Sequence, residues 1–582
     1  MRVNYPRFLL RFFLAMMTFY LAVYLFMLEF WPMSLAVFVA GVWFILSFKD
    51  TVAERRYDAH FANPKELDSL TRDPLAGDGV MIGFAYKDLL AVRPGSAGKR
   101  ELGHFLWVGP NRSGKGLSIT SNLLQWEGSA IVVDVKGEIS GATAGYRQDV
   151  LGQTVFILNP SSHEKSHQYD PFAELETDEQ VFSAATAFMN PNQDGENAVF
   201  AQRASAALAA IIRGAKIKNW PVIPTIDALL YHPDGMRGAA LALRQLDDRM
   251  INKWLNAFLS KDPDKMDWEA AASDRFLNNS WQRLVTAAQY LTTDGVIHMT
   301  GGSDFRATDL MDGRVTVYLV FRESELDLTL PLFNLVVDAM VRAMLRKYDM
   351  NVPHYSANGT KVLGIFDEAY RATPHALPDY SATVSGRGVY LCVYVQSIAQ
   401  LTDKWGKAGR TTLLDNVHTK IFLPSVDRNE SDKDSTASFV SSSCGEYMVE
   451  DRGIHKQEHG HELSSNVRLT QRELITASEF GQLPPTRSVV ITNELPPILA
   501  HRLEPWRFRA FEEAKLYPLP ELPDKDETAR QTIELPELKA EVLRDDKKPK
   551  AKVRPKAKPA VSLEQNQGQD ERGEEPEVLG FR

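Results

Sequence analysis

The sequence predicts an α/β protein in which a parallel-sheet domain carries an all-helical insertion and follows two membrane-spanning helices. Three observations lead to this class. Short apolar strands alternate with helical segments, as in a parallel sheet with helices on both faces. A glycine-rich turn joins one such strand to a helix. Two apolar stretches near residue 1 are each long enough to cross a bilayer.

The composition is that of a globular protein, and it limits the possible functions. The chain has 582 residues, enough for several domains, of which 44% are hydrophobic and 24% charged. A net charge of −9 does not indicate a general polyanion binder, so any contact with nucleic acid must be local. The two cysteines, Cys392 and Cys444, cannot form a disulfide framework and favour a reducing compartment.

Residues 1–49 predict a transmembrane hairpin. The stretches 8–28 and 30–48 are apolar apart from Arg11, and each is close to the ~20 residues that a spanning helix needs. A cleaved signal peptide would have one shorter apolar core and a small-residue cleavage site, and neither is evident. Basic residues precede the first span and follow the second, so the positive-inside rule places both termini in the cytoplasm. They are Arg2, Arg7, Lys49, Arg55 and Arg56.

The nucleotide assignment depends on residues 104–115, HFLWVGPNRSGK. An apolar strand is followed by the pattern G-x-x-x-x-G-K and then by a helical segment, which is the context of a phosphate-binding loop. Glycine lets the backbone curl so that its N–H groups face a phosphate, and the helix N-terminus adds its dipole. A glycine-rich turn with an exposed lysine is the alternative. The predicted phosphate-binding residues are Gly109, Pro110, Asn111, Arg112, Ser113, Gly114, Lys115 and Gly116.

The end of this motif predicts how ATP and Mg2+ are held. Lys115 is expected to reach the β- and γ-phosphates as a point charge. The next position usually carries a Ser or Thr that binds magnesium, but here it is Gly116. Ser118 is close in sequence but out of register. Magnesium must then be held through water and a distant carboxylate.

Other apolar runs outline the sheet. Residues 79–92 predict an edge hairpin, and a long helix is expected at about 328–348. Runs that are apolar throughout predict strands buried on both faces, with ligands at their carboxyl ends. These strands are expected at 129–135, 155–158, 315–321, 361–366, 389–396, 420–424 and 488–492, of which 488–492 is expected to be the last.

The pattern changes twice along the chain. From about residue 178 to 289, Ala-rich amphipathic segments dominate and strand signals are scarce, which predicts an all-helical insertion. Beyond about residue 517 the chain is polar, with a basic cluster and then an acidic stretch; this predicts a disordered tail, or alternatively a docking or nucleic-acid-binding arm. The predicted domains are the anchor 1–49, the nucleotide-binding parts 50–175 and 301–516, the helical insertion 176–300 and the tail 517–582.

Strand ends supply the carboxylates of the predicted site. Asp367 and Glu368 follow the strand 361–366, and in ATP hydrolases such a pair holds magnesium and activates water. Both would lie near the γ-phosphate if this strand neighbours the loop strand. Acids at a strand end or a helix N-cap are the alternative. Asp134, at the end of the run 129–135, could assist the metal or hold its own loop.

Polar residues near the strand 389–396 complete the set. Gln396 ends this strand, where it could sense the γ-phosphate or orient water, or be a polar strand end. Arg387 is flanked by glycines and is a candidate finger that reaches across a subunit interface. Arg371 and Arg410 compete for that role.

Together these motifs resemble the TraG/TraD-type coupling proteins of bacterial type IV secretion and conjugation. The resemblance covers about residues 100–500 and rests on the combined signature rather than on one motif. The loop GPNRSGKG and the segment DVKGE, from Asp134 to Glu138, carry most of it. Further matching residues are Tyr146, Arg147, Phe366, Asp367, Glu368, Gly386, Arg387, Gly388, Gln396, Ser397, Asn416, Lys420, Ile421, Leu469, Thr470 and Pro485.

The resemblance implies a RecA-like ATPase that uses ATP and Mg2+, with Asp367 at the metal, and that forms a homo-hexamer at the bacterial inner membrane. It implies recruitment of DNA with its relaxase and accessory proteins, or of protein effectors, to a type IV secretion channel and its inner-membrane components. The helical insertion is expected to read this cargo. The family usually has a periplasmic segment between its spans. That segment is nearly absent here, which shifts the expected channel contacts into the membrane.

Two other functions remain open. A membrane-tethered DNA translocase of the chromosome-segregation type would share the loop and the anchor, but the DVKGE segment and the large insertion argue against it. A docking platform that binds nucleotide with little turnover is motivated by Gly116, but a scaffold would not need Glu368. The sequence therefore predicts an ATPase that couples cargo selection to secretion. Its predicted catalytic residues are Lys115, Asp367, Glu368, Gln396 and Arg387.

Overall fold

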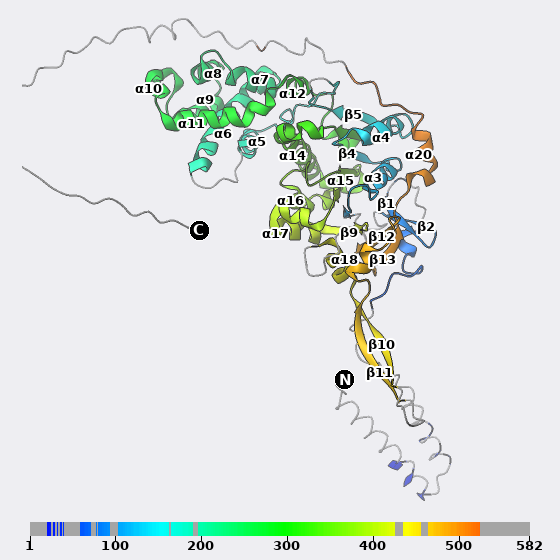
Figure 1. The fold of residues 1–582 in the computed structure, drawn as a ribbon. Helices are drawn as coiled ribbons and strands as arrows, with labels where there is room; N and C mark the ends of the chain where they lie inside the picture. Colours follow the sequence, from blue (N-terminus) through cyan, green and yellow to red (C-terminus); the bar gives the residue numbers. More distant parts are fainter. Residues whose placement is uncertain are drawn as a thin grey trace, which may run out of the picture. The chain divides into compact units, whose positions relative to one another are not determined.

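The computed structural model describes residues 59–71, 77, 79–93, 103–161, 164–189, 196–424, 435–455, 464–523 and 533, with scattered positions between 20 and 39. An 11-stranded sheet in the order β2-β1-β13-β12-β9-β3-β8-β7-β4-β6-β5 organises these residues (Figure 1). The strands are β1 (Val80–Ala85), β2 (Asp88–Val92), β3 (His104–Val108), β4 (Ser129–Val133), β5 (Thr154–Leu158), β6 (Val315–Leu319), β7 (Val362–Phe366), β8 (Val389–Val395), β9 (Val417–Phe422), β12 (Arg487–Thr492) and β13 (Ile498–His501).

The sheet is parallel from β9 to β5 and antiparallel at the other edge. All residues of β3 are buried, since alternate side chains enter cores on opposite faces. Leu106 belongs to one core, with α14 (Leu326–Met350) and α17 (Ile398–Asn416). Trp107 belongs to the other, with α3 (Lys115–Leu123) and α4 (Glu138–Asp149). Helices on both faces explain why the strand sequences are continuously apolar.

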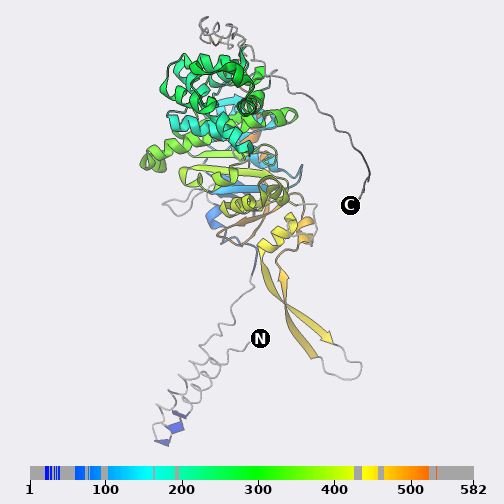
Figure 2. The ribbon, with the colours of Figure 1, turned by 90° about the vertical axis from the view of Figure 1, so that its left-hand side faces the viewer.

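Between β5 and β6 the described chain is helical, and we call this run the helical domain; the sheet with its flanking helices is the sheet domain. The helical domain forms a cluster beside the strands (Figure 2). Aspartates begin several of its helices: the Asp248 carboxylate, for example, accepts the amides of Met250 and Ile251. Its helices are α5 (Asp178–Met189), α6 (Glu196–Lys218), α7 (Val222–Leu230), α8 (Gly235–Arg244), α9 (Arg249–Leu259), α10 (Trp268–Ala272), α11 (Arg275–Ala288) and α12 (Asp294–Met299).

The structure differs from the expected strands in two places. β13 follows β12, so residues 488–492 are not the last strand. A ribbon of β10 (Glu446–His455) and β11 (Ser464–Glu473) was not predicted. Its sequence is rich in charged and polar residues, so it lacks the apolar alternation of a half-buried strand, and backbone pairing along ten residue pairs forms it. The remaining helices are α13 (Asp309–Asp312), α15 (Val352–Asn358), α16 (Leu377–Ser381), α18 (Thr436–Cys444), α19 (Ala477–Gly481) and α20 (Arg509–Ala514).

The predicted membrane spans lie outside the described residues except at scattered positions between 20 and 39, and the predicted tail lies outside them beyond residue 523 apart from residue 533. Within the described chain, one helical stretch, Glu323–Met350, is long and apolar enough to cross a bilayer. Half of its most apolar window is buried inside the protein, and its buried apolar side chains belong to the sheet core. We therefore assign this stretch to the core.

His104 joins the start of β3 to two neighbouring elements. Its side chain is fully buried, Nε2 lies 2.9 Å from the Ser381 carbonyl oxygen, and the Leu391 amide donates to Nδ1 at 2.9 Å. These two partners select the neutral ring that carries its proton on Nε2. Burial lowers the pKa of His104 to about 4.

Acid should therefore destabilise the protein through His104. The pKa of this group is lower in the folded than in the unfolded chain, so its contribution is complete above pH 6.5 and is lost as the pH falls toward 4. About 2 kcal/mol of unfolding free energy should be lost at pH 5. His104→Gln keeps a donor but cannot titrate, so urea unfolding at pH 7.5 and pH 5 should show a smaller difference in this variant. Equal differences in both proteins would contradict the assignment.

Candidate nucleotide-binding site

Residues 109–114 connect β3 to α3 in a tight turn. Arg112 and Gly114 have positive φ angles of 62° and 104°, which bend the backbone at two points. The Gly109 amide donates to the Val395 carbonyl at 3.1 Å and so ties the loop to the end of β8. A Cβ atom on Gly109 would lie 2.8 Å from the Ser113 Oγ, which explains the glycine there.

The Lys115 side chain lies inside this loop. It is only 6% exposed, and its Nζ donates to the carbonyl oxygens of Gly109 at 2.7 Å and Pro110 at 3.2 Å. Burial lowers the pKa of Lys115, while the charges of Glu368 and Asp367 oppose this shift. The Ser118 hydroxyl donates to the Lys115 carbonyl at 2.7 Å, so it serves the backbone of α3.

The two acids after β7 reach the loop although their strand does not neighbour β3. The condition of adjacent strands, under which the acids were placed near the γ-phosphate, is not met, because β8 lies between β3 and β7. Asp367 and Glu368 nevertheless line the same pocket of about 610 Å³ as Lys115, since parallel strands end at one edge of the sheet. Burial, and then the charge of Glu368, raises the pKa of Asp367 to about 6.

The position of β8 brings Gln396 to Glu368. Gln396 Nε2 donates to Glu368 Oε2 at 3.0 Å, and the Gln396 amide donates to Gln400 Oε1 at 2.8 Å. Glu368 has a φ of 47°, an uncommon conformation for a residue with a side chain. The backbone turn and Gln396 thus hold the Glu368 carboxylate at the edge of the pocket.

Asp134 lines this pocket and also holds its own turn. Its Oδ2 accepts hydrogen bonds from the amide and the hydroxyl of Ser140 at 2.7 and 2.8 Å. Gly137, with a φ of 72°, leads into α4. The sequence left two roles open for Asp134, binding the metal or holding its own loop. The hydrogen bonds to Ser140 support the second role.

The candidate arginines do not all meet at this edge. Arg387 precedes β8, so it lies at the opposite end of that strand from Gln396, and it pairs with Asp349 at 2.9 Å. Arg371 lies near Glu368 and pairs with Glu323 at 3.6 Å. Arg410 donates to Thr402 within α17. Within one chain the structure brings Lys115, Asp367, Glu368 and Gln396 together and leaves Arg387 apart.

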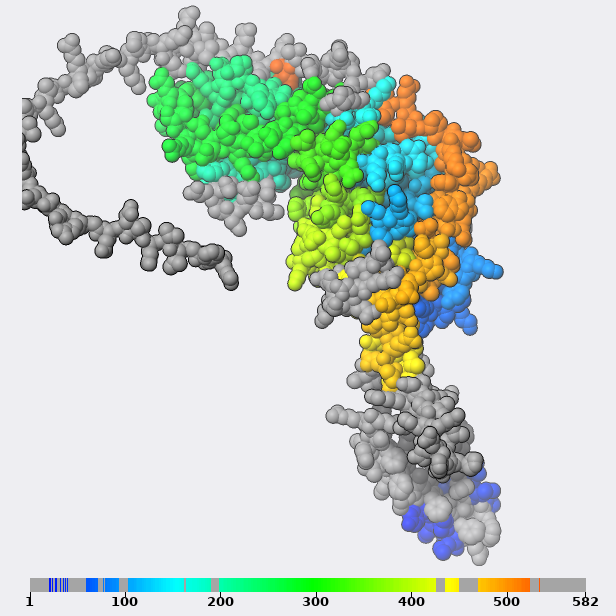
Figure 3. Space-filling model, viewed as in Figure 1, coloured from blue at the N-terminus to red at the C-terminus, as the bar shows by residue number. Residues whose placement is uncertain are grey.

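Several pocket residues were not among the predicted site residues. Arg502 donates to the Ser113 carbonyl at 2.8 Å across 389 positions of sequence. Pro505, in a 3-10 turn (Pro505–Arg507), and Phe511, on α20, also line the pocket. Figure 3 shows the surface of this C-terminal segment, in orange, beside the blue and cyan surface of α3 and α4. Lys136 lines the pocket from the turn after β4, and the DVKGE resemblance was the available signal for it.

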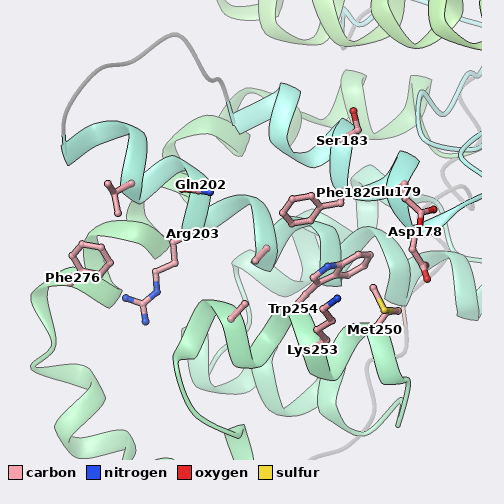
Figure 4. Close-up of a pocket in the computed structure, with 13 residues that line it drawn as sticks. Asp178, Glu179, Phe182, Ser183, Gln202, Arg203, Met250, Lys253, Trp254 and Phe276 are labelled. Atoms are coloured by element: carbon pink, nitrogen blue, oxygen red, sulfur yellow. The ribbon is translucent and has the colours of Figure 1, made fainter.

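A second cavity, of about 710 Å³, lies in the helical domain (Figure 4). Side chains from α5, α6, α9 and α11 line it. The Phe182 and Trp254 rings stack at 6.0 Å, and the Arg203 guanidinium lies 5.0 Å from the centre of the Phe276 ring. Phe182 and Phe276 are 37% and 41% exposed, so apolar surface faces this cavity and the solvent.

Three features define the class of P-loop nucleotide-binding proteins. They are a phosphate-type loop on a mixed α/β sheet, acids that follow the second strand from the loop strand, and a helical domain between two strands. A family model narrows this class: "Type IV secretory system Conjugative DNA transfer" matches residues 77–518. The chain belongs to this family.

Individual relatives agree with this family. "Protein VirD4" of Rhizobium radiobacter is 25% identical over 439 residues, covering 72% of this chain and 59% of the relative. "Conjugal transfer protein TraG" of Escherichia coli is 25% identical over 407 residues, covering 66% and 62%. The chain thus spans about three fifths of the length of these relatives.

Solved structures share the fold. "Bacterial conjugative coupling protein TrwBdeltaN70" has a TM-score of 0.56 and 15% identity, covering 78% of this chain and 97% of that protein. "Plasmid coupling protein TrwB in complex with ADP and Mg2+" has a TM-score of 0.53 and 16% identity, covering 78% and 96%. The expected RecA-like nucleotide-binding fold is therefore confirmed for the sheet domain.

Gly116 offers a gain-of-function test. A Cβ atom at this position would have no heavy atom within 4 Å, so a serine fits without strain on its neighbours. Gly116→Ser would supply the hydroxyl that usually binds magnesium. We expect the Mg2+ concentration for half-maximal ATP binding to fall about threefold or more, since one added ligand of this kind contributes on the order of 1 kcal/mol. Gly141→Ser, also in open space but on α4, should change nothing. Equal Mg2+ dependence in all three proteins would contradict the placement of Gly116.

Proposed function

We propose that this protein is an inner-membrane coupling ATPase that hydrolyses ATP to drive DNA–relaxase complexes or protein effectors into a type IV secretion channel. The convergence of Lys115, Asp367 and Glu368 on one pocket carries the proposal, together with Gln396, which donates to Glu368 from the neighbouring pocket. Glu368 accepts the proton of the attacking water, and Gln396 holds the Glu368 carboxylate in place. Asp134 holds the turn beside them.

The residues present fit ATP and Mg2+. The Ser113 Oγ is buried and, within the described structure, has no hydrogen-bond partner. Its hydroxyl therefore suits donation to a phosphate oxygen of ATP. No group of three or more His, Cys, Asp or Glu residues in the described chain could hold a metal alone. This agrees with magnesium, which binds one or two carboxylates together with phosphates and water, and Asp367 is the carboxylate we assign to it. Bound magnesium would neutralise charge on the phosphates.

The assembly and the anchor extend this proposal. Exposed apolar side chains at described positions between 20 and 39, such as Met27 at 80% and Leu35 at 65%, favour a bilayer around residues 8–48. We place both termini in the cytoplasm. The domains we propose are the anchor 1–49, the nucleotide-binding parts 50–175 and 301–516, the helical insertion 176–300 and the tail 517–582. Arg387 lies away from its own loop, which suits a finger that acts on the neighbouring subunit of a homo-hexamer.

The helical domain reads the cargo, and the cavity lined by α5, α6, α9 and α11 is the surface we assign to it. Exposed aromatic side chains are typical anchors of protein recognition. Serine at both Phe182 and Phe276 should leave ATP turnover intact and reduce cargo transfer between cells. Unchanged transfer would exclude this cavity.

ATP turnover tests the proposal. The full-length protein in lipid nanodiscs should hydrolyse ATP, more rapidly with single- or double-stranded DNA, and Lys115→Ala should not. Turnover that ignores DNA would point to protein cargo. Bound nucleotide without turnover would favour the docking platform.

A further inference from the structure

Lys136 lies where two pockets of the nucleotide-binding edge meet. The 610 Å³ pocket contains Lys115 and Asp367, and a neighbouring pocket of about 300 Å³ contains Gln396 and Arg371. Three residues line both pockets: Asn111, Lys136 and Glu368. Lys136 is therefore the one cation common to the two pockets, on the side occupied by the water-activating acid.

The turn after β4 fixes the backbone of Lys136. The hydrogen bonds from Ser140 to Asp134 hold the residue two positions before it, and Gly137 follows in the left-handed conformation. The Gly137 amide also donates to the Asp134 carbonyl at 3.4 Å. The DVKGE segment thus presents a lysine from a rigid turn to the edge of the sheet.

Three of the cations that line these two pockets already have partners. Lys115 donates to the loop, Arg371 pairs with Glu323, and Arg502 donates to Ser113. For Lys136 the described structure contains no hydrogen bond or ion pair, and its charge acts on Lys115 and lowers the pKa of that group. Two ammonium groups that repel each other beside an acid form a favourable arrangement once a polyanion lies between them.

We propose that Lys136 is a second catalytic cation, which contacts the γ-phosphate of ATP on the side of Glu368. This role rests on the proposed ATPase function. In the reaction, the oxygen of water bonds to the γ-phosphorus, the bond from this phosphorus to the β–γ bridging oxygen breaks, and its electron pair stays with ADP. The proton of the water passes to Glu368. Negative charge is redistributed over the γ-phosphoryl oxygens and the leaving oxygen, and Lys136 stabilises it there.

The loop of this site lacks the usual magnesium-binding hydroxyl, because Gly116 stands at that position. The site nevertheless contains the acid and the glutamine of a hydrolytic site, and a second catalytic cation explains this combination. Lys115 approaches the phosphates from the loop, and Lys136 approaches from the turn after β4, three strands away in the sheet. The two lysines would act on opposite sides of the same phosphoryl group. A lysine suits this position because its ammonium is a compact charge on a flexible stem.

The test compares Lys136→Met and Lys136→Arg with Lys65→Met, which removes an exposed lysine from the segment before β1. Full-length proteins in nanodiscs are assayed for kcat and for the dissociation constants of ADP and of ADP with aluminium fluoride, both with Mg2+. The fluoride complex imitates the γ-phosphoryl group in flight. Lys136→Met should lower kcat about 100-fold and weaken the fluoride complex by a similar factor, with ADP affinity within about threefold. Lys136→Arg should recover much of both losses, and Lys65→Met should resemble the wild type.

Two results would overturn the assignment. The first is a Lys136→Met protein with unchanged kcat and unchanged affinity for the fluoride complex. The second is an equal loss of affinity for ADP and for the fluoride complex, because a residue that only shapes the pocket would weaken both. Failure of the proposed function is distinct: the wild type itself would then show no turnover, and the ratio of the two affinities would report only whether Lys136 contacts the γ-phosphoryl position.

Discussion

Replacing Glu368 by Gln should reduce kcat for ATP hydrolysis by about 10³-fold while nucleotide still binds. The amide cannot accept the proton of the attacking water, but it matches the carboxylate in size and can still meet Gln396 in the turn after β7. Lys115 and the loop are untouched, so affinity for ADP should stay within about threefold of the wild type. Steady-state turnover and calorimetric titration with ADP measure the two quantities.

The matched control is Glu127→Gln. This residue precedes β4, at the other end of the parallel strands, where it pairs with Arg314 at 3.1 Å. Exposed pairs of this kind contribute about 1 kcal/mol or less, so turnover should not change. A Glu368→Gln protein that keeps wild-type turnover would remove the acid from the mechanism and would favour a nucleotide-binding docking platform.

Arg147 should be the most costly single side chain to remove from the sheet domain. It is fully buried on α4, and its guanidinium donates to Thr316 Oγ1 at 2.9 Å and to the carbonyl oxygens of Trp126 at 2.9 Å and Gly128 at 3.2 Å. It also donates to the Leu123 carbonyl. Burial lowers the pKa of Arg147 to about 10, which leaves the group charged at neutral pH. It therefore ties the end of α3, the connection to β4 and the strand β6 together.

Arg147→Met keeps much of the volume but leaves these oxygens without donors. We expect a loss of about 3 kcal/mol or more in unfolding free energy, and a fall in Tm of roughly 6 °C or more. The Tm of Arg147→Lys should lie between those of the wild type and of Arg147→Met, because one ammonium can satisfy only part of this cluster of oxygens. Gln148→Met, at the exposed neighbouring position, should leave Tm unchanged. Thermal unfolding followed by circular dichroism gives the order, and a Met variant as stable as the wild type would contradict this role.

Motifs confined to a few consecutive residues were predictable. The phosphate-type loop, the strand before it and the acids after β7 each depend on local spacing and on burial on both faces. The strands at 129–135, 315–321 and 389–396 appear as β4, β6 and β8 with ends shifted by a few residues. The charged ribbon β10–β11 escaped prediction because backbone pairing, rather than apolar burial, forms it.

Relations between distant segments had no local signal. Because β8 lies between β3 and β7, Gln396 reaches Glu368 and donates a hydrogen bond to it. Because β13 runs antiparallel to β12, Arg502 reaches the loop and donates to the Ser113 carbonyl. Strand order depends on how whole faces pack, which no short window of sequence contains. The chain's local patterns thus specified a nucleotide loop, a sheet and their acids. Long-range packing specified which side chains meet around the phosphates, because it sets which strand ends are neighbours.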